Sequence, residues 1–378
     1  MTLCSCDDPV LIVVLLPSKL PHHSTMISNV TQLDNATLEM FTNRTLSNTL
    51  SVIYILVILI SFPGNILSMV LLVFYTKPKT PTIIFMINLS ITDLALGSFL
   101  PFQVIYHIKG YDWNYGETLC SVVSVMFYSN MYCSILTMMA ISAERYFGIV
   151  HPMKYDCRRK HYAIGACLAM WALVLGVLYP MESTDLTYRV KELNITTCFD
   201  VLKKDMLPTM QHWAAFLFVL VFILFLIPFI ITVSCYIAII VCLLKERDTR
   251  SIHKRRAISL AILVVLVFVT CFAPNNIIFF LHIINKIYYE KSYYAAYKLS
   301  LSFSCVNSCL DPFIYYFASK DFRRKFRKLF GLPVSNSDLI TTQHFRESLF
   351  SARSLSQAEA DEEQNGLSPT LKKKESTI

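Results

Sequence analysis

Seven long apolar stretches constrain the fold of this chain more than any other feature of its sequence. They cover residues 50–75, 82–107, 119–149, 161–181, 213–244, 256–286 and 294–318. A helix needs about 20 mostly apolar residues to cross a bilayer, and each stretch reaches that length. Only 16% of the residues are charged, below the ~25% of typical soluble domains. We therefore predict an all-α membrane protein, a bundle of seven transmembrane helices.

Basic residues mark one side of the predicted bundle. They follow the first, third and seventh spans and precede the sixth; those between spans are Lys77, Lys79, Lys154, Arg158, Arg159, Lys160, Lys254, Arg255 and Arg256. Because cytoplasmic loops carry an excess of Lys and Arg, we expect this side to be cytoplasmic and the N-terminus extracellular. The placement of these residues in a multi-pass plasma-membrane protein explains the net charge of +8, so we expect no nucleic-acid partner.

Residues 1–48 precede the first span and are expected to form a glycosylated extracellular N-terminus. The apolar run from Val10 to Leu16 follows Asp7 and Asp8, and an acidic leading region makes a poor signal peptide. Met26 is therefore an alternative start, which would leave residues 1–25 upstream of it. Glycosylation sequons in segments predicted to lie outside begin at Asn29, Asn35, Asn43 and Asn194.

Two of the twelve cysteines occupy well-defined extracellular positions in this topology. Cys120 begins the third span, and Cys198 lies in the loop between the fourth and fifth spans. Disulfides form and persist in the oxidising extracellular environment, so we expect these two cysteines to be bonded.

Three regions follow from these patterns beyond the N-terminus. The seven-helix domain covers residues 49–319. Phenylalanines spaced four apart among basic residues, Phe322, Phe326 and Phe330, predict a short amphipathic helix over residues 320–330 with its apolar face on membrane lipids. Residues 331–378 are polar and rich in serine, which predicts a disordered cytoplasmic tail.

The tail carries two candidate interaction sites. Candidate kinase sites are Ser348, Ser351, Ser354 and Ser356. The alternative is a tail that only solubilises the chain. The last residues, Ser376–Ile378, are a candidate ligand for a PDZ domain, which binds a C-terminal carboxylate by strand addition.

Charged residues also lie within the apolar spans. Glu144-Arg145-Tyr146 ends the third span, and Asp93 lies in the middle of the second. Placing a charged side chain in a bilayer costs roughly 2.5–3.5 kcal/mol, so such residues usually have a function. For Arg145 alone, the alternative is a side chain that extends to the lipid head groups.

Each span carries at least one short motif, and the third carries two. In chain order they are Gly64-Asn65, Asn88-Leu89-Ser90 with Asp93, Cys120, Glu144-Arg145-Tyr146, Trp171, Pro228, Phe272-x-Pro274 and Asp311-Pro312-x-x-Tyr315-Tyr316. Over about residues 50–330 this series resembles the rhodopsin-like (class A) G-protein-coupled receptors. Phe272 and Asp311 stand where many relatives have Trp and Asn, and the sequence is similar to the purinoceptor-like branch.

The resemblance implies a receptor that converts binding of an extracellular ligand into activation of a heterotrimeric G protein. The implied coupling and switch residues are Glu144, Arg145, Tyr146, Tyr236, Phe272, Pro274, Pro312 and Tyr316. Relatives with an acid at the base of the sixth span can tether the arginine there, but this chain has Lys254, so we expect Glu144 to be the main acid that restrains Arg145. The closest resemblance within the branch suggests the G12/13 class, which activates Rho, and receptor kinases and arrestin are the expected partners of the serine-rich tail.

Polar residues of the second, third and seventh spans are expected to surround Asp93. Asn307, Ser308 and Asp311 share one helix face, since positions i, i+3 and i+4 stack. Carboxylate, amide and hydroxyl oxygens suit a hard cation, and the resemblance makes that cation an allosteric sodium ion. The expected sodium site is Asp93, Asn130, Ser134, Asn307, Ser308 and Asp311. The alternative is a water-filled polar core without a specific ion.

The extracellular half of the bundle is rich in aromatic residues with a few cations. Such a pocket suits a ligand with an apolar body and an anionic head, so we predict an anionic lipid or a lipid–peptide conjugate. The candidate ligand-binding residues are Tyr106, His107, Tyr128, Arg189, Lys203, Asn276, Phe279, His282, Tyr297 and Lys298. A nucleotide is the alternative, but nucleotide-binding relatives carry a His-x-x-Arg/Lys pattern where this chain has Asn276 and Phe279. Many of the aromatic residues could equally be packing within the bundle.

Other classes of membrane protein fit less well. A transporter or channel predicts inverted repeats and a charged path through the membrane, whereas these motifs do not repeat. For an enzyme, the nine histidines are scattered without zinc spacing, and no nucleophile is paired with a base. We therefore expect no catalytic residues.

Overall fold

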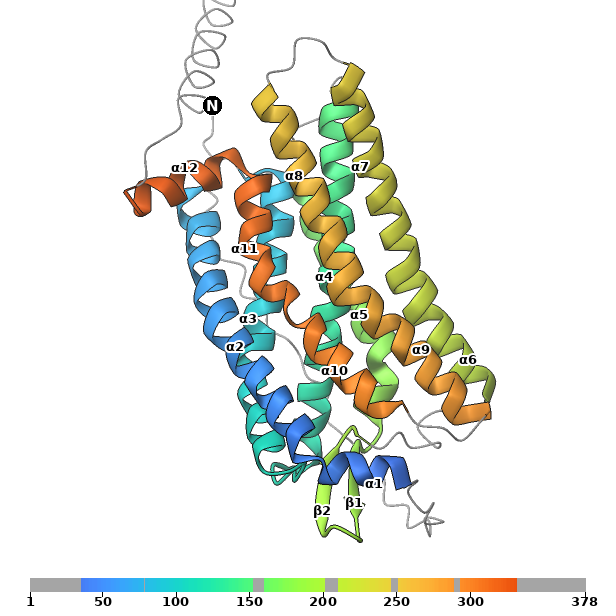
Figure 1. Ribbon diagram of the computed structural model, residues 1–378. Coiled ribbons are helices and arrows are strands. Elements are labelled where there is room, and N and C mark those ends of the chain that lie inside the picture. The colour runs from blue at the N-terminus through green and yellow to red at the C-terminus, as the bar shows by residue number, and fades with distance from the viewer. Residues whose placement is uncertain are drawn as a thin grey trace, which may run out of the picture.

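The computed structural model describes residues 35–77, 79–151, 160–200, 210–245, 251–288 and 293–331. Helices run side by side along one axis and form a single bundle (Figure 1). In chain order the helices are α1 (Asn35–Thr42), α2 (Arg44–Val70), α3 (Pro81–Ile108), α4 (Gly116–Val150), α5 (Lys160–Ser183), α6 (Met210–Phe218), α7 (Ile227–Lys245), α8 (Ser251–Val267), α9 (Ala273–Tyr288), α10 (Tyr294–Ser304), α11 (Asn307–Ala318) and α12 (Lys320–Leu329). Two antiparallel strands, β1 (Thr187–Val190) and β2 (Ile195–Cys198), pair Thr187 with Cys198 and Val190 with Ile195.

Six of the predicted spans are helices long and apolar enough to cross a membrane in the described part of the chain. They cover Arg44–Tyr75, Pro81–Ile108, Gly116–Val150, Lys160–Ser183, Ala214–Lys245 and Ile258–Asn285. Short π-helical segments lie within or end three of them, at Leu71–Tyr75, Val219–Leu226 and Phe268–Phe272. Large apolar side chains on the outer faces are exposed, such as Leu59 (64%) and Ile262 (62%). This is the surface that a bundle in contact with lipid requires.

The seventh predicted span is present but interrupted. It consists of α10 and α11, which are separated at Cys305 and Val306. The hydroxyl groups of Ser300, Ser302 and Ser304 each donate to the backbone carbonyl three residues earlier, at 2.7–2.8 Å. Such side-chain bonds compete with the helical backbone pattern in the turns just before the break.

Asn65 replaces a backbone hydrogen bond that Pro312 cannot make in this span. Proline has no N–H, so Pro312 cannot donate to the carbonyl of Ser308 four residues earlier. The Asn65 Nδ2 group of α2 donates to that carbonyl instead, at 3.0 Å. A Cβ at Gly64 would lie 3.3 Å from Pro312 Cγ, so a glycine allows this close approach. The Gly64-Asn65 motif thus joins α2 to α11.

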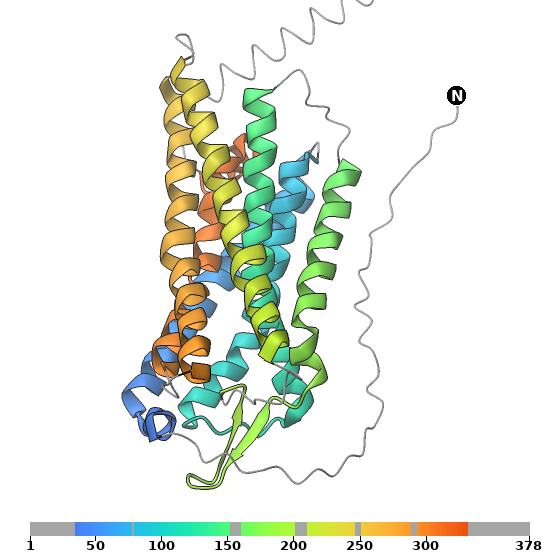
Figure 2. The ribbon, with the colours of Figure 1, turned by 90° about the vertical axis from the view of Figure 1, so that its right-hand side faces the viewer.

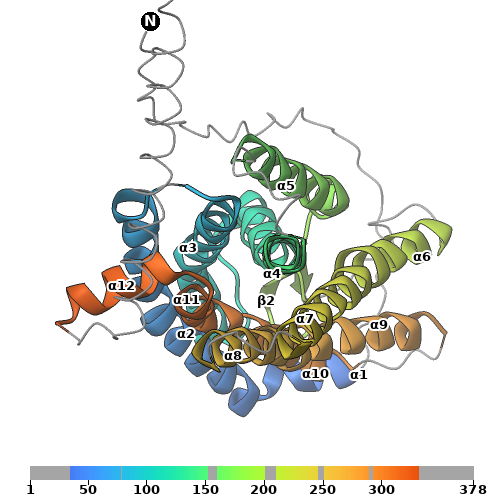
Figure 3. The ribbon, with the colours of Figure 1, turned by 90° about the horizontal axis from the view of Figure 1, so that it is seen from above.

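Helix α4 lies at the centre of the bundle. Viewed along the helices, it is surrounded by α3, α5 and α7 (Figure 3). Most of its residues between Cys120 and Ser142 are buried. Side chains from α3, α10 and α11 therefore reach a common interior, and the candidate site residues lie there.

The two ends of the bundle differ (Figures 1 and 2). One end carries α1, β1 and β2, and we call it the hairpin end. The other end carries α12, which turns away from α11, and we call it the α12 end. The Ser319 hydroxyl accepts from the Phe322 N–H at 3.2 Å and caps α12.

Two sequence expectations are corrected here. Residues 1–48, predicted as the extracellular N-terminus, include α1, and α2 begins at Arg44, before the predicted start of the first span. Phe322 is buried and packs against Tyr315, with ring centroids 6.1 Å apart, so this ring contacts the bundle rather than lipid. Phe330 is 55% exposed, as an apolar face on lipid requires.

Candidate functional site

A buried ion pair lies at the hairpin end between α10 and the segment that follows β2. Lys298 Nζ contacts the Asp200 carboxylate, and the side chains are 7% and 0% exposed. The Tyr294 hydroxyl donates to Asp200 Oδ1 at 2.6 Å, and the Tyr106 hydroxyl donates to Asp200 Oδ2. One carboxylate thus receives an ammonium group and two phenols.

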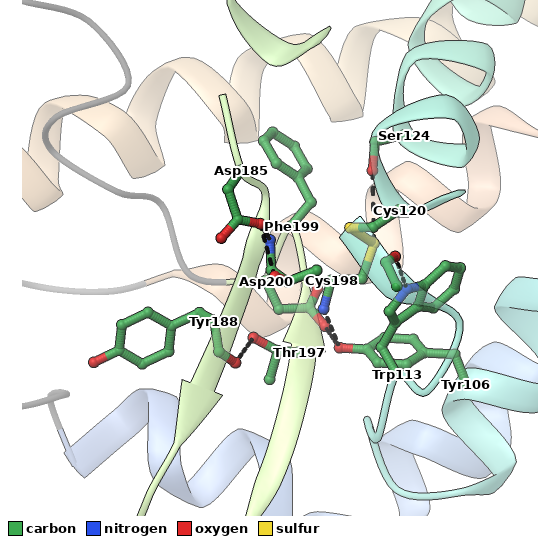
Figure 4. The surroundings of a disulfide bond; sticks show 12 residues. Tyr106, Trp113, Cys120, Ser124, Asp185, Tyr188, Thr197, Cys198, Phe199 and Asp200 are labelled. Atoms are coloured by element: carbon green, nitrogen blue, oxygen red, sulfur yellow. Dashed lines mark hydrogen bonds between the residues drawn. A yellow bond between two sulfur atoms is a disulfide. The ribbon is translucent and has the colours of Figure 1, made fainter. Parts of the chain in front are cut away.

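A disulfide holds Asp200 in this position (Figure 4). Cys120 and Cys198 are bonded, with Cα atoms 5.7 Å apart, which confirms the predicted pair. The backbone N–H of Cys198 donates to the Tyr106 hydroxyl at 3.3 Å. Phe199 follows with φ +57°, a left-handed conformation that turns the chain just before Asp200. The loop is therefore fixed to α4 two residues before the carboxylate.

Aromatic rings line the interior next to the ion pair. The hydroxyl groups of Tyr128 on α4 and Tyr297 on α10 are hydrogen-bonded to each other. The Tyr297 ring also contacts Phe279, at 5.1 Å between centroids, and stacks on His282 at 6.0 Å. Tyr132 donates to Asn276 Oδ1 at 3.3 Å. The structure thus brings five predicted ligand-binding residues into one cluster: Tyr128, Asn276, Phe279, His282 and Tyr297.

His107 lies beside the ion pair with one ring nitrogen available as an acceptor. Its Nδ1 is 2.6 Å from the Gln103 carbonyl oxygen, so Nδ1 carries the proton and Nε2 carries the lone pair. The residue is 1% exposed, and Nε2 has no hydrogen-bond partner among the described residues. The ring contacts Tyr106, with centroids 5.1 Å apart, and the Tyr106 hydroxyl donates to Asp200.

The other predicted cations lie elsewhere. Arg189 is exposed on β1, and its guanidinium donates to Asn194 Oδ1 at 3.2 Å, so it faces the hairpin turn rather than the cluster. Lys203 lies outside the described residues. Sequence reasoning missed Asp200 as a site residue. The one sequence feature that could have identified Asp200 as a site residue was its position two residues after the bonded Cys198.

A short loop and α1 cover the cluster at the hairpin end. Tyr111, in the loop between α3 and α4, contacts Phe41 of α1 with ring centroids 5.4 Å apart and Tyr106 at 5.7 Å. Both Tyr111 and Phe41 are buried. Burial, together with the nearby Asp200 carboxylate, raises the pKa of the Tyr111 phenol above its ordinary range.

The predicted glycosylation sites fall partly within the described residues. Asn43 is exposed, and its Oδ1 accepts from the Leu46 N–H at 3.0 Å to cap α2. Asn194 is exposed in the hairpin turn. Asn35 begins α1, and Asn29 lies outside the described residues.

Oxygen-bearing side chains surround Asp93 at the middle of the bundle. Asp93 Oδ1 accepts from Asn130 Nδ2 at 3.0 Å and from Ser308 Oγ at 2.8 Å. Asp311 interacts with Asp93, and both carboxylates are fully buried. Within the described chain, hydrogen-bond partners are lacking for Asp93 Oδ2, Ser134 Oγ, Asn307 Oδ1 and both Asp311 oxygens. These oxygens fit a hard cation, which would satisfy them and offset the buried negative charge.

The coupling residues gather toward the α12 end. Glu144 is 6% exposed, and Arg145 interacts electrostatically with the buried Tyr236 of α7. Tyr146 instead contacts His151, with its hydroxyl 3.1 Å from Nε2. Lys254 lies on α8, but its side chain is outside the described set.

The two adjacent tyrosines of α11 have different surroundings. Tyr315 is fully buried, and its hydroxyl accepts from Ser90 Oγ of α3 at 3.2 Å. Tyr316, the residue selected from the sequence, accepts from Arg327 Nε of α12 at 3.1 Å. Tyr315 is therefore the tyrosine that faces the bundle interior in this structure, and sequence reasoning missed it.

Phe272 and Pro274 lie between the aromatic cluster and the α12 end. Phe272 is fully buried and packs edge-on against Phe268, with ring centroids 5.6 Å apart. Pro274 is half-buried just after the π-helical segment Phe268–Phe272. This irregular backbone directly follows α8, whose other end lies beside α7 at the α12 end of the bundle (Figure 1).

Comparisons with known proteins agree with this arrangement. The family described as the 7 transmembrane receptor (rhodopsin family) matches residues 64–315. Purinoceptor 8 of Gallus gallus is 56% identical over 333 residues, which cover 88% of this chain and 93% of the relative. The S-geranylgeranyl-glutathione receptor P2RY8 of Homo sapiens is 48% identical over 359 residues, 93% and 99% of the two chains. Proteinase-activated receptor 2 of Rattus norvegicus is 39% identical over 297 residues, 78% and 74% of the two chains.

Proposed function

The chain belongs to the rhodopsin family of seven-transmembrane receptors, and from this premise we propose that its ligand is a lipid conjugated to a charged peptide head. Receptors of this family couple an extracellular ligand to a heterotrimeric G protein, and this chain is such a receptor. The relative P2RY8 is named for S-geranylgeranyl-glutathione. We propose the same class of ligand for this chain.

One observation carries the proposal: a buried ammonium group lies beside an aromatic cluster. Lys298 is 5% exposed next to Tyr294 and near Tyr297. An anionic head paired with this lysine and an apolar body on the rings would use both features. A nucleotide has less support, because Asn276 and Phe279 supply no charge where nucleotide-binding relatives carry a basic pattern.

Signalling is proposed to run from the hairpin end, which would be extracellular, to the α12 end, which would be cytoplasmic. A ligand in the aromatic cluster would contact α9 through Phe279, and α9 continues through Phe272 into α8. Movement of α8 would open the α12 end beside Arg145 for a G protein of the G12/13 class. Receptor kinases and arrestin would then act on the serine-rich tail, and a PDZ domain on Ser376–Ile378.

An allosteric sodium ion is proposed at the Asp93 cluster. The unpartnered oxygens of Ser134, Asn307 and Asp311 support it. A bound cation would supply positive charge there and favour the inactive arrangement of α4 and α11. The residues themselves hold α3, α4 and α11 together through the Asp93 hydrogen bonds to Asn130 and Ser308.

The ligand proposal is tested by G-protein dissociation in cells that express the receptor. S-geranylgeranyl-glutathione is compared with adenine and uracil nucleotides on the wild type, on Lys298→Met, and on Lys191→Met, which removes an exposed lysine of the hairpin. We expect the conjugate to activate the wild type and Lys191→Met, and Lys298→Met to lose the response at equal surface expression. A response to nucleotides alone, or unchanged potency in Lys298→Met, would overturn the proposal.

A further inference from the structure

The Lys298–Asp200 pair is complete without a ligand. Lys298 Nζ is paired with Asp200, and both carboxylate oxygens have further donors, Tyr294 on Oδ1 and Tyr106 on Oδ2. Both charged side chains are almost entirely removed from solvent. A ligand anion that binds Lys298 must therefore either share this ammonium group with Asp200 or replace Asp200 as its partner.

Whether the Asp200 carboxylate keeps a cationic partner then determines which ligand head groups bind well. A purely anionic head would place a second negative charge beside Asp200 with a single buried ammonium group for both, or would leave Asp200 without its cation, and either outcome is unfavourable. A head that carries an ammonium group next to a carboxylate would pair with both residues, so neither buried charge would lose its partner. The disulfide at Cys198 limits the alternative in which Asp200 moves out to solvent.

His107 provides a second, independent observation that favours a ligand with an ammonium group. Its Nε2 is buried, carries the lone pair and has no partner within the described residues, and the ring packs against Tyr106, whose hydroxyl donates to Asp200. An ammonium group is a donor with three N–H bonds and would satisfy this acceptor together with Asp200. A carboxylate would not do so, because it has no proton to donate.

We infer that Asp200, His107 and Lys298 together bind a zwitterionic head, an α-amino acid group in which Asp200 and His107 receive the ammonium and Lys298 receives the carboxylate. This rests on the proposed function and narrows it from an anionic head to one that carries both charges. In a glutathione conjugate, the γ-glutamyl end is such a group. Asp200 is then a specificity-determining residue of the pocket.

The inference is tested with two compounds, S-geranylgeranyl-glutathione and its N-acetyl derivative, which keeps the carboxylates and removes the ammonium charge. Potency is measured by G-protein dissociation on the wild type, on Asp200→Asn and on Glu192→Gln, a neutralised exposed acid of the hairpin. We expect N-acetylation to lower potency about tenfold or more on the wild type and on Glu192→Gln, as expected for loss of a charged hydrogen bond. On Asp200→Asn the two compounds should differ less than about threefold, within the spread of such measurements.

Two results would overturn the inference while leaving the proposed function intact. One is equal potency of the two compounds on the wild type, a comparison that holds even if Asp200→Asn does not reach the cell surface. The other is discrimination by Asp200→Asn equal to that of the wild type. A wild-type receptor that responds to neither compound would instead overturn the proposed function, and the inference with it.

Discussion

Breaking the buried ion pair should destabilise the ligand-free receptor, and removing both charges should restore most of the loss. Lys298→Met keeps the length of the side chain but leaves the Asp200 carboxylate, which is 0% exposed, without its cation. Asp200→Asn in the same chain replaces that carboxylate with a neutral amide. The amide oxygen can still accept from Tyr106 and Tyr294.

The magnitude follows from the contacts that remain in Lys298→Met. Removing one partner of a buried pair costs about 3–5 kcal/mol. The two tyrosine hydroxyls continue to donate to Asp200, so we expect a value near the lower limit, about 3 kcal/mol. At roughly 2–4 °C for each kcal/mol in a domain of this order of size, Tm should fall by about 6–12 °C. The double variant should recover most of this shift.

The assay is the thermal unfolding of purified receptor in detergent, without ligand, for the wild type, both single variants and the double variant. Lys191→Met serves as the control for loss of an exposed lysine and should leave Tm unchanged. Additive losses in the double variant would show that the two residues are not energetically coupled. A fall of less than about 1 °C in Lys298→Met would refute the reasoning from burial, since it corresponds to well under 1 kcal/mol.

Three further predictions concern the rest of the bundle. Sodium should raise the Tm of the wild type relative to the same concentration of potassium, and Asp93→Asn should abolish the difference; a wild type indifferent to sodium would contradict the cation site. Glu144→Gln should raise basal G-protein signalling, because we expect the buried Glu144 carboxylate to restrain Arg145. The matched change Glu117→Gln, in the first turn of the same helix, should not raise it. Basal activity of Glu144→Gln equal to that of the wild type would show that another restraint dominates. Gly97→Ala should cost about 1–3 kcal/mol, because the new Cβ would lie 2.8 Å from Phe62 Cδ2, and a companion Phe62→Leu change should recover part of the lost Tm.

The membrane-spanning helices could be predicted from sequence because lipid leaves few choices. Every backbone polar group in a bilayer must be satisfied within the chain, so an apolar stretch of sufficient length is nearly always a helix. The break between α10 and α11 could not be predicted this way. The hydroxyl bonds of Ser300, Ser302 and Ser304 precede it, but Thr92 and Ser142 make similar bonds within unbroken helices, so serine content gives no signal for the break.

The candidate site was predicted in part. Lys298 and Tyr297 do lie beside His282, because α9 and α10 are consecutive helices of the bundle that meet at the hairpin end. Asp200 was missed because it belongs to a loop, and the turn that buries it depends on the left-handed backbone at Phe199. No periodic pattern reports such a turn.

The choice between Tyr315 and Tyr316 shows the same limit on a helix. Adjacent helical residues point about 100° apart, and both side chains here are tyrosine. Which one enters the interior depends on how α11 is rotated, and the Asn65 bond to the Ser308 carbonyl helps to fix that rotation. Sequence gives the spacing of side chains but not the rotation of the helix that carries them.

The closed state of the ion pair also has a consequence for the time course of signalling. Lys298 and Asp200 are out of contact with water, so a ligand cannot meet them by diffusion alone. The cover formed by α1 and the loop between α3 and α4 must open first, and opening sets a maximum rate of association. The observed association rate should therefore level off as agonist concentration rises. Once the cover has closed again, the same barrier slows escape, and the agonist should remain bound long after it is washed from the medium.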